Sequence, residues 1–477
     1  MPYAQLKQTK AIQPKHNVTL PQPLDSKTCT VKADCRSHAL IVPFPSCPLP
    51  LHIQPSIPQQ VAAPTPNMHL QTLLPVLSAL GTTAVIASQP PAHLWATHYS
   101  GNVYSLTLKD NDLSISQTLD TCGDMPSWLT LDAHTRTVYC TDESGSADPS
   151  THGSLTALHV QPDGTLREGA VASAVGGGVN SVIYQAGGGK KYLAIAHYGG
   201  SAISTFSLPI KQNQPTLQAF HFNLTRPGKV PQQDSSHPHQ VFLDPTGSFI
   251  VSPDLGADLL RVYAIENGQS GKLSECPSVN VTFGSGPRHG VFWTDASDWS
   301  VGAWSTRSQK TKAIGETMMY LANEIGGTVM VFDVSYPRSG CLSFEKTQTM
   351  VPYPGGVMPE GATPAGISRI GDDFYVSIRS DQGFAPSDSM VVLDRSPEGG
   401  PLELRDLSSA LGKVPRTFAI NRAGDLVAIG NQASATVAIV RRDPKTGDLG
   451  EEVATLQIGE PGKVGTAEGL SSVIWDE

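Results

Sequence analysis

Residues 237–263 read HPHQVFLDPTGSFIVSPDLGADLLRVY, and this stretch decides the fold. Val241 and Leu243 alternate with polar neighbours, which is typical of a half-buried strand. Residues 244–247 have Pro at the second position and Gly at the fourth, which predicts a tight turn. Residues 256–258 predict another turn. The stretch therefore predicts three short strands joined by two tight turns.

Similar stretches recur along the chain with a period of roughly 50 residues. Each has a strand, a turn, a second strand that ends in a polar residue, a Gly turn and a third strand. The copies begin near Ser127, Asn180, His239, Arg288, Pro364 and Arg416. Three to four strands per unit at this spacing predict a β-propeller or a similar radial array.

The two ends of the repeat region complement each other. The first unit begins near His93 and lacks its own first strand, whereas residues 470–475 form a lone strand at the C-terminus. If the last strand completes the first unit, the first strands number seven and the ring closes without an open edge. We therefore predict an all-β, seven-bladed propeller over residues 88–477. Residues 406–412 also allow a short turn of helix.

The composition restricts the classes of function. Gly 45 and Pro 38 with only 16% charged residues suit many short strands, and the net charge of −9 disfavours a nucleic-acid partner. No CxxC pair is present, so a zinc or redox motif has little support. Four cysteines lie in the repeat region, at positions 122, 140, 276 and 341. They predict either two disulfides or buried free thiols, and the sequence leaves both open.

The first 87 residues differ from the repeat region. Residues 1–67 are rich in Pro and poor in apolar periodicity, which predicts a disordered extension. Residues 68–87, MHLQTLLPVLSALGTTAVIA, resemble a secretory signal peptide. If translation starts at Met68, we expect a secreted product that begins near Ser88 and lacks residues 1–67. Otherwise the segment is a linker with a first buried strand, and the protein is cytoplasmic.

Two further features bear on the compartment. Pro75 and the polar residues around it disfavour a transmembrane helix, so we expect no membrane partner. N-glycosylation sequons occur at Asn17, Asn223 and Asn280, and the last two fall in the repeat region. The sequons are compatible with secretion.

The repeat also predicts a site. In a hairpin, the start of the first strand lies beside the end of the second, so residues at these positions share one face of the propeller. The polar residues there predict a ring around the mouth of a central channel. They are His197, Tyr198, His239, Asp254, Arg288, Asn323, Glu324, Arg379, Arg416 and Asn431.

The residue types in this ring point to an anionic ligand. Arg side chains present a planar fork that suits a carboxylate or phosphate. Glu324 and His239 are candidates for acid–base chemistry. The alternative is that each residue locks a blade through hydrogen bonds, for instance an Arg paired with Asp254 or Glu324. His237 and His239 alternate as a metal clip would, but no carboxylate cluster accompanies them, so we predict no metal.

These motifs resemble a known family, the seven-bladed lactonase propellers, also called the cycloisomerase 2 family. The resemblance covers about residues 90–477 and is carried by HPHQVFLDPTG, PDLGADLLRVY, GPRHGVF, LANEIGGTVMVF, GNQASATVAIV and the closing GLSSVIWDE. The family includes bacterial-type 6-phosphogluconolactonases and fungal carboxy-cis,cis-muconate cyclases. The resemblance implies a catalytic set of His239, Arg288, Glu324 and Arg379, with no metal and no cofactor.

Together these observations predict an enzyme that opens the lactone ring of a small anionic substrate, as a 6-phosphogluconolactonase does. The alternatives are a lactone-forming muconate cycloisomerase and a non-catalytic propeller that serves as an interaction platform. We expect five of the six remaining ring residues, all except Asp254, to bind the substrate. These are His197, Tyr198, Asn323, Arg416 and Asn431.

Overall fold

The structure is a computed structural model that describes residues 90–148, 150–295, 315–396 and 400–477. The predicted extension, residues 1–67, and the predicted signal peptide, residues 68–87, lie outside the described residues. None of the helical segments among the described residues has the length and apolar character needed to span a bilayer.

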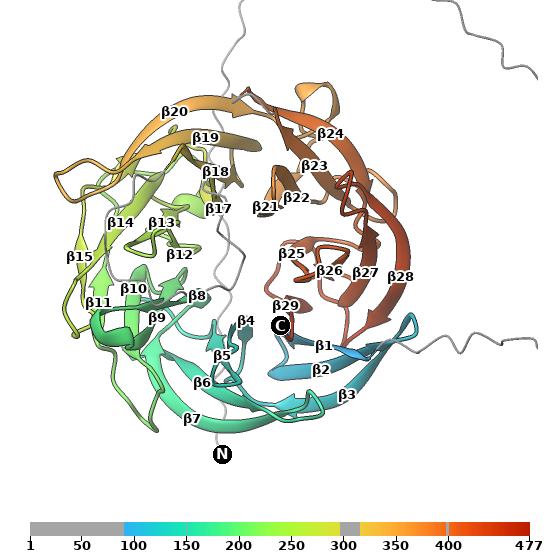
Figure 1. Cartoon of the computed structure of the whole chain (residues 1–477), viewed down its shortest axis with the longest axis horizontal. Coiled ribbons are helices and arrows are strands. Elements are labelled where there is room, and N and C mark those ends of the chain that lie inside the picture. Colours follow the sequence, from blue (N-terminus) through green and yellow to red (C-terminus); the bar gives the residue numbers. More distant parts are fainter. Residues whose placement is uncertain (1–89, 149, 296–314, 397–399) are drawn as a thin grey trace, which may run out of the picture. The chain divides into compact units, whose positions relative to one another are not determined.

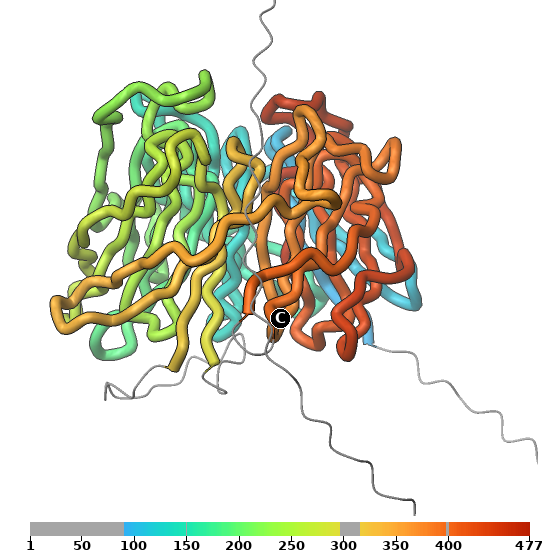
Figure 2. Tube along the Cα trace, turned by 90° about the horizontal axis from the view of Figure 1, so that it is seen from above, coloured from blue at the N-terminus to red at the C-terminus, as the bar shows by residue number. Residues whose placement is uncertain are grey.

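Seven antiparallel sheets are arranged around a central axis, and each sheet is one blade of a propeller (Figure 1). Seen from the side, the strands run between two faces that are formed by loops (Figure 2). The chain fills each blade from the innermost strand outward, except that blade one takes its innermost strand from the C-terminus. The prediction of an all-β, seven-bladed propeller is confirmed.

The first four blades have the following strands, from the innermost to the outermost. Blade one consists of β29 (Leu470–Trp475), β1 (Ala92–His98), β2 (Asn102–Lys109) and β3 (Asp112–Asp120). Blade two consists of β4 (Pro126–Asp132), β5 (Thr137–Asp142), β6 (His152–Val160) and β7 (Leu166–Val175). Blade three consists of β8 (Gly178–Gln185), β9 (Lys191–His197), β10 (Ala202–Ser207) and β11 (Gln218–His221). Blade four consists of β12 (Phe242–Leu243), β13 (Phe249–Asp254), β14 (Leu259–Ile265) and β15 (Leu273–Glu275), with β16 (Val279–Asn280) also paired to β14.

The last three blades are regular four-stranded sheets. Blade five consists of β17 (Pro287–Thr294), β18 (Thr317–Asn323), β19 (Thr328–Ser335) and β20 (Ser343–Met350). Blade six consists of β21 (Thr363–Ile370), β22 (Asp373–Arg379), β23 (Ser389–Arg395) and β24 (Leu402–Ser409). Blade seven consists of β25 (Pro415–Ile420), β26 (Leu426–Asn431), β27 (Thr436–Arg442) and β28 (Leu449–Gln457). The helical turn expected at residues 406–412 is wrong, because residues 406–409 continue the outer strand β24.

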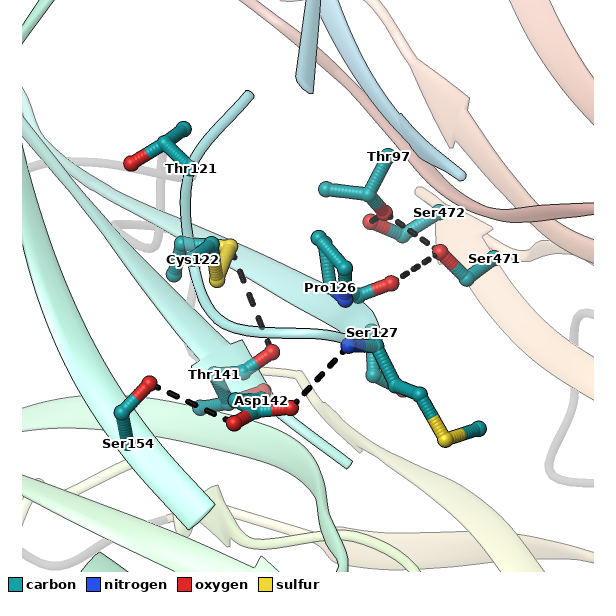
Figure 3. Close-up of a disulfide and its surroundings, with 12 residues drawn as sticks. Thr97, Thr121, Cys122, Pro126, Ser127, Thr141, Asp142, Ser154, Ser471 and Ser472 are labelled. Carbon is teal, nitrogen blue, oxygen red and sulfur yellow. Dashed lines mark hydrogen bonds between the residues drawn. A yellow bond between two sulfur atoms is a disulfide. The ribbon is translucent and has the colours of Figure 1, made fainter. Parts of the chain in front are cut away.

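The C-terminal strand closes the ring, as predicted. β29 pairs antiparallel with β1, so that Trp95 lies opposite Ile474. Ser471 Oγ lies 2.7 Å from Thr97 Oγ1 and 2.5 Å from the carbonyl oxygen of Pro126 in blade two (Figure 3). The last strand therefore contacts both the first blade and its neighbour.

The apolar core is divided among the blade interfaces. The buried apolar residues described form seven clusters, and each cluster joins two adjacent blades. Tyr320 of blade five and Phe374 of blade six, for example, lie in one cluster with ring centroids 4.0 Å apart. A single blade has no core of its own, so the stability of each blade depends on both of its neighbours.

All four cysteines of the repeat region form disulfides, and this settles what the sequence left open. Cys122–Cys140 joins the loop after β3 in blade one to β5 in blade two. Cys276–Cys341 joins the end of blade four to the loop before β20 in blade five. Each disulfide therefore bridges two adjacent blades.

Removing either disulfide should lower the melting temperature. In the chain-entropy model, the 18-residue separation of Cys122–Cys140 corresponds to about 3 kcal/mol, and the 65-residue separation of Cys276–Cys341 to about 4 kcal/mol. We expect both double Cys→Ala variants to melt below the wild type, with the Cys276 and Cys341 variant the lower of the two. Thermal unfolding followed by fluorescence measures this, and an unchanged melting temperature in both variants would contradict it.

Candidate functional site

The innermost strands carry a repeated irregularity at the centre of the propeller. In blade five, Pro287 pairs with Asn323 and His289 with Ala322, so Arg288 lies between them without a partner across the strand. The pairing skips one residue at the same place in four other blades. The skipped residues are Ser471, Ser127, Val179 and Arg416. Bulges of this kind often lie beside active sites, where they redirect a side chain.

The first group of charged residues consists of one carboxylate between two guanidinium groups. Glu324 follows the end of β18, and its Oε2 lies 2.8 Å from Arg288 Nε and 2.7 Å from Arg379 Nη2. Arg288 is 1% exposed, and its Nη1 also donates to the carbonyl oxygen of Ala365 in blade six, at 2.9 Å. This group therefore joins the inner edges of blades five and six.

A second carboxylate binds the third Arg. Glu143 follows β5 in blade two, and its Oε2 lies 3.4 Å from Arg416 Nη2. The same oxygen accepts hydrogen bonds from the hydroxyls of Tyr99, at 2.6 Å, and Ser127, at 2.5 Å. The guanidinium of Arg416 lies over the ring of Tyr99, 5.6 Å from its centroid. We call the two groups together the ionic site.

Burial and neighbouring charges together set the protonation states of Arg288 and Glu324. Burial lowers the pKa of Arg288 to about 9, and the neighbouring charge of Arg379 adds to the fall. Burial tends to raise the pKa of Glu324, but Arg379 and Arg288 outweigh it and hold that pKa below the ordinary 4.5. Glu324 is therefore ionised at neutral pH. Three guanidinium groups against two carboxylates leave one positive charge, which favours an anionic ligand.

Aromatic and imidazole rings from four blades meet at the propeller axis. Trp128 of blade two lies 5.8 Å from His289 of blade five, and His289 lies 5.2 Å from His239 of blade four, measured between ring centroids. Tyr198 of blade three lies 5.6 Å from His239 and stacks on His237 at 4.0 Å. Since these rings come from blades on different sides of the axis, they bring the inner edges of the blades into contact.

His239 and His289 are both buried and uncharged. Burial lowers the pKa of each imidazole well below 6.5, and the positive charge of Arg288 lowers it further. Nδ1 of His239 and Nε2 of His289 have no hydrogen-bond partner among the described residues. At neutral pH both rings are therefore uncharged, and a ring nitrogen without a proton can accept a hydrogen bond. Burial and the charge of Glu324 raise the pKa of Tyr198 to about 12, so its hydroxyl stays protonated at neutral pH and can donate a hydrogen bond.

The structure brings together six of the residues predicted from the sequence. Glu324 contacts Arg288 and Arg379 directly, and charges on Arg288 and Arg416 act on His239. The ring of Tyr198 lies 5.6 Å from that of His239. Their placement agrees with the expectation that strand ends share one face. Their catalytic and binding roles stay predictions.

Other predicted residues make hydrogen bonds to neighbouring strands and loops. His197 Nε2 lies 2.7 Å from Ser204 Oγ on the neighbouring strand of blade three. Asn323 Nδ2 donates to the carbonyl oxygen of Leu321, at 3.1 Å. Asn431 Nδ2 donates to the carbonyl oxygen of Ala410, at 2.9 Å. The predicted contact of His197, Asn323 and Asn431 with a substrate therefore stays untested.

Asp254 makes hydrogen bonds within its own blade, as expected if it locks the blade and does not bind a ligand. Its carboxylate accepts from Arg261 Nε at 2.8 Å and from the backbone N–H of His237 at 2.8 Å. The partner is thus an Arg of the same blade and not one of the three Arg in the ionic site. The described ranges contain no group of three or more His, Cys, Asp or Glu side chains arranged to hold a metal ion.

The sequence reasoning missed Tyr99, Ser127, Glu143 and His289. A signal for them existed, because Glu143 follows the second strand of blade two as Glu324 follows that of blade five. Tyr99 occupies the same position after β1 as Tyr198 does after β9. Applying the strand-end rule to every blade would have found both.

The fold and the ionic site define a seven-bladed propeller in which three guanidinium groups and two carboxylates lie at the inner edges of the blades. The profile of the family described as "Lactonase, 7-bladed beta-propeller" matches residues 93–466. The chain belongs to this family of seven-bladed lactonase propellers.

Two relatives and one solved structure show how similar individual proteins are to this chain. The chain is 28% identical over 344 residues to a protein of Arthroderma benhamiae named "Probable 6-phosphogluconolactonase", covering 72% of this chain and 80% of the relative. It is 24% identical over 352 residues to a 6-phosphogluconolactonase of Formosa agariphila, covering 73% and 90%. Among solved structures, the periplasmic gluconolactonase PpgL of Pseudomonas aeruginosa superimposes with a TM-score of 0.64 at 23% identity, covering 81% of this chain and 99% of that one. At this identity the superposition supports the fold alone.

Proposed function

We propose that this protein is a lactonase that hydrolyses the lactone ring of a small anionic substrate. The observation that carries the proposal is the single Glu324 carboxylate between the guanidinium groups of Arg288 and Arg379. The set combines a base with two donors for a developing negative charge, which is the combination that ester hydrolysis needs. Membership of the family and the names of the relatives at 28% and 24% identity support the same reaction class.

In the proposed reaction, Glu324 accepts a proton from the water that attacks the lactone carbonyl carbon. The carbonyl oxygen becomes an oxyanion, which Arg288 or Arg379 stabilises. The bond from the carbonyl carbon to the ring oxygen then breaks, and the proton passes to the ring oxygen. The product is an open-chain hydroxy acid, and its new carboxylate suits the positive charge of the ionic site.

An anionic substrate would also activate the base. In the free protein, Arg379 and Arg288 hold the pKa of Glu324 low, which makes the carboxylate a weak base. A substrate anion that binds Arg379 takes one positive charge away from Glu324, so the pKa of Glu324 rises toward a value better suited to proton transfer. We propose that His239, which is neutral and whose Nδ1 has no hydrogen-bond partner among the described residues, accepts a hydrogen bond from the water or the substrate.

A pH-indicator assay of the purified protein tests the proposal. Lactone opening releases acid, so we would compare the rate of acidification above spontaneous hydrolysis for sugar lactones, phosphorylated lactones and muconolactones. Acid release with a sugar or phosphorylated lactone supports the proposal. Acid release with the muconolactones alone would instead support the cycloisomerase alternative, because reopening a muconolactone to the muconate also frees a carboxylic acid. No reaction with any of the three classes would favour a binding platform.

We also propose that the protein is secreted through an oxidising compartment. Two disulfides between blades support this, because disulfides persist in such compartments and are rare in the cytosol. Asn223 and Asn280 are both exposed and lie in sequons completed by Thr225 and Thr282. The apolar run at residues 68–87 supplies the corresponding signal in the sequence.

Secretion predicts a processed and glycosylated product. We expect mass spectrometry of protein from the culture medium of the native host to find an N-terminus near Ser88 and glycans on Asn223 and Asn280. A Thr225→Ala variant should lose the glycan on Asn223, whereas Thr225→Ser should keep it, because Ser preserves the sequon. Peptides from residues 1–67 on the secreted protein would contradict the processing, and protein found only inside the cell would contradict secretion.

A further inference from the structure

The geometry points to a second functional carboxylate, Glu143, that the proposed reaction does not use. All of its hydrogen bonds and its ion pair are made by one oxygen, Oε2, which contacts Tyr99, Ser127 and Arg416. The other oxygen, Oε1, accepts no hydrogen bond from the described residues. The side chain of Glu143 is 17% exposed, against 23% for Glu324, so both carboxylates are open to a ligand to a similar degree.

The three donors hold the carboxylate of Glu143 in one orientation. The hydroxyls of Tyr99 and Ser127 come from blades one and two, and Arg416 comes from blade seven, so three blades fix the same oxygen atom. Burial raises the pKa of Tyr99, which keeps its hydroxyl a donor at neutral pH. An ionised carboxylate can only accept hydrogen bonds. Oε1 is therefore a pre-oriented acceptor whose ligand must be a donor.

Glu143 also changes which anions the ionic site can take. Without Glu143, Arg416 would have no carboxylate beside it, and the site would carry two net positive charges and favour a substrate with several carboxylates. With Glu143 beside it, Arg416 is neutralised, and a second anionic group placed there would face a carboxylate. A neutral hydroxyl can bind at this position, because it donates to Oε1 and brings no charge that Glu143 would repel.

We propose that Glu143 recognises a hydroxyl group of the substrate, so that the site selects hydroxylated lactones with no more than one anionic group. The proposal rests on the proposed lactonase function and names the substrate class of that site. The anionic group or the developing carboxylate binds at Arg288 and Arg379, and a ring hydroxyl donates to Glu143 Oε1. A lactone that carries several carboxylates and no hydroxyl is excluded by charge.

Two lactones with the same six-membered ring test the proposal. D-Glucono-δ-lactone carries hydroxyls, and δ-valerolactone carries none. For Glu143→Gln we expect kcat/KM for gluconolactone to fall on the order of 10- to 100-fold, the range for losing one hydrogen bond to a charged group, and kcat/KM for valerolactone to change less than about threefold. A fall of equal size for both lactones, or for neither, would overturn the proposal, because a supporting role for Arg416 affects both substrates alike.

A binding measurement separates this proposal from the proposed function. Titration calorimetry compares gluconate with pentanoate, which lacks hydroxyls, on the wild type and on Glu143→Gln. If the wild type turns over neither lactone, the proposed function fails, and a selective loss of gluconate affinity still supports Glu143 as the hydroxyl site. If gluconate and pentanoate weaken together, or neither weakens, the hydroxyl site is wrong even when turnover is present.

Two further variants guard against a folding artefact. Glu452→Gln changes an exposed carboxylate on the outer strand β28 and should leave both substrates and the melting temperature unchanged. Tyr99→Phe removes one donor to Glu143 and keeps the ring beside Arg416, so it should reduce gluconolactone turnover selectively but by a smaller factor than Glu143→Gln. If Glu143→Gln does not fold, an equal effect of Tyr99→Phe on both lactones overturns the proposal.

Discussion

Glu324→Gln should reduce kcat/KM by roughly 10²- to 10⁴-fold, the usual contribution of a positioned general base. The Gln amide keeps the size of the side chain and one oxygen for a guanidinium, but it cannot take a proton from water. The activity has to be expressed per folded molecule, since the variant also leaves Arg288 and Arg379 without the carboxylate that each contacts in the structure. Unpaired charges at a buried site are destabilising, so we expect a lower melting temperature as well.

Anions and pH separate the two effects of this substitution. Phosphate should raise the melting temperature of Glu324→Gln more than that of the wild type, because an anion can replace the missing charge and ligand binding stabilises the folded state. The folded pKa of Glu324 lies below 4.5, so its stabilising charge is present above that pH and is lost as the pH falls through the folded value. The melting temperatures of wild type and variant should therefore converge in acid.

Melting temperature and activity of Glu324→Gln, measured together, distinguish a catalytic from a structural role of Glu324. If Glu324→Gln melts early but the folded fraction retains full activity, Glu324 only locks blades five and six together. Glu452→Gln on the outer strand is the matched control, since it makes the same chemical change at an exposed position.

Arg288→Lys should reduce kcat/KM by about 10²- to 10³-fold, the range for losing one donor to a developing oxyanion. Arg288 makes two separate contacts, from Nη1 to the carbonyl oxygen of Ala365 and from Nε to Glu324, and a single ammonium cannot make both. Steady-state kinetics on the lactone found active in the screen gives the comparison. Arg167→Lys, on the outer strand β7, is the control and should leave the rate unchanged.

The same variant should acquire a pH dependence that the wild type lacks. Burial brings the pKa of Arg288 down to about 9, which still leaves the guanidinium charged at pH 7. A Lys starts from an ordinary pKa of about 10.4, so a similar fall in pKa would leave part of the ammonium groups deprotonated and uncharged at neutral pH. Activity of Arg288→Lys should decline as the pH rises from 6 to 8. A flat profile with near-wild-type rates would show that Arg288 carries no charge needed for turnover.

Local sequence patterns predicted the fold well because each blade repeats the same turn chemistry. The stretch around residues 244–247 shows why: Asp244 accepts from the backbone N–H groups of Thr246, Ser248 and Phe249, so the turn is specified by residues within a few positions. Closure was predictable from the unmatched strands at the two ends. The predicted helical turn at residues 406–412 was wrong, because the pairing of residues 406–409 with β23 outweighed the local preference for a turn.

The site was only partly predictable, since its pairings cross blades. The position of Glu324 followed from the repeat, but its contact with Arg379 depends on how blades five and six pack. The pair of Glu143 and Arg416 joins residues 273 positions apart, and no local pattern reports such a contact. Asn323 and Asn431 show why a polar residue at the end of a strand does not by itself indicate a ligand. Their side-chain amides donate to Thr328 and Thr436, each across the turn that follows its own strand.

The skipped residue on the inner strand of five blades has a consequence for how the site can change during evolution. Arg288, Arg416 and Ser127 have no partner across the strand, so replacing one of them leaves the ladder of backbone hydrogen bonds around it intact. The seven apolar clusters that hold the blades together lie elsewhere. The side chains at the axis can therefore be exchanged one at a time during evolution. The same fold can then acquire new substrates without changes to the apolar interfaces between its blades.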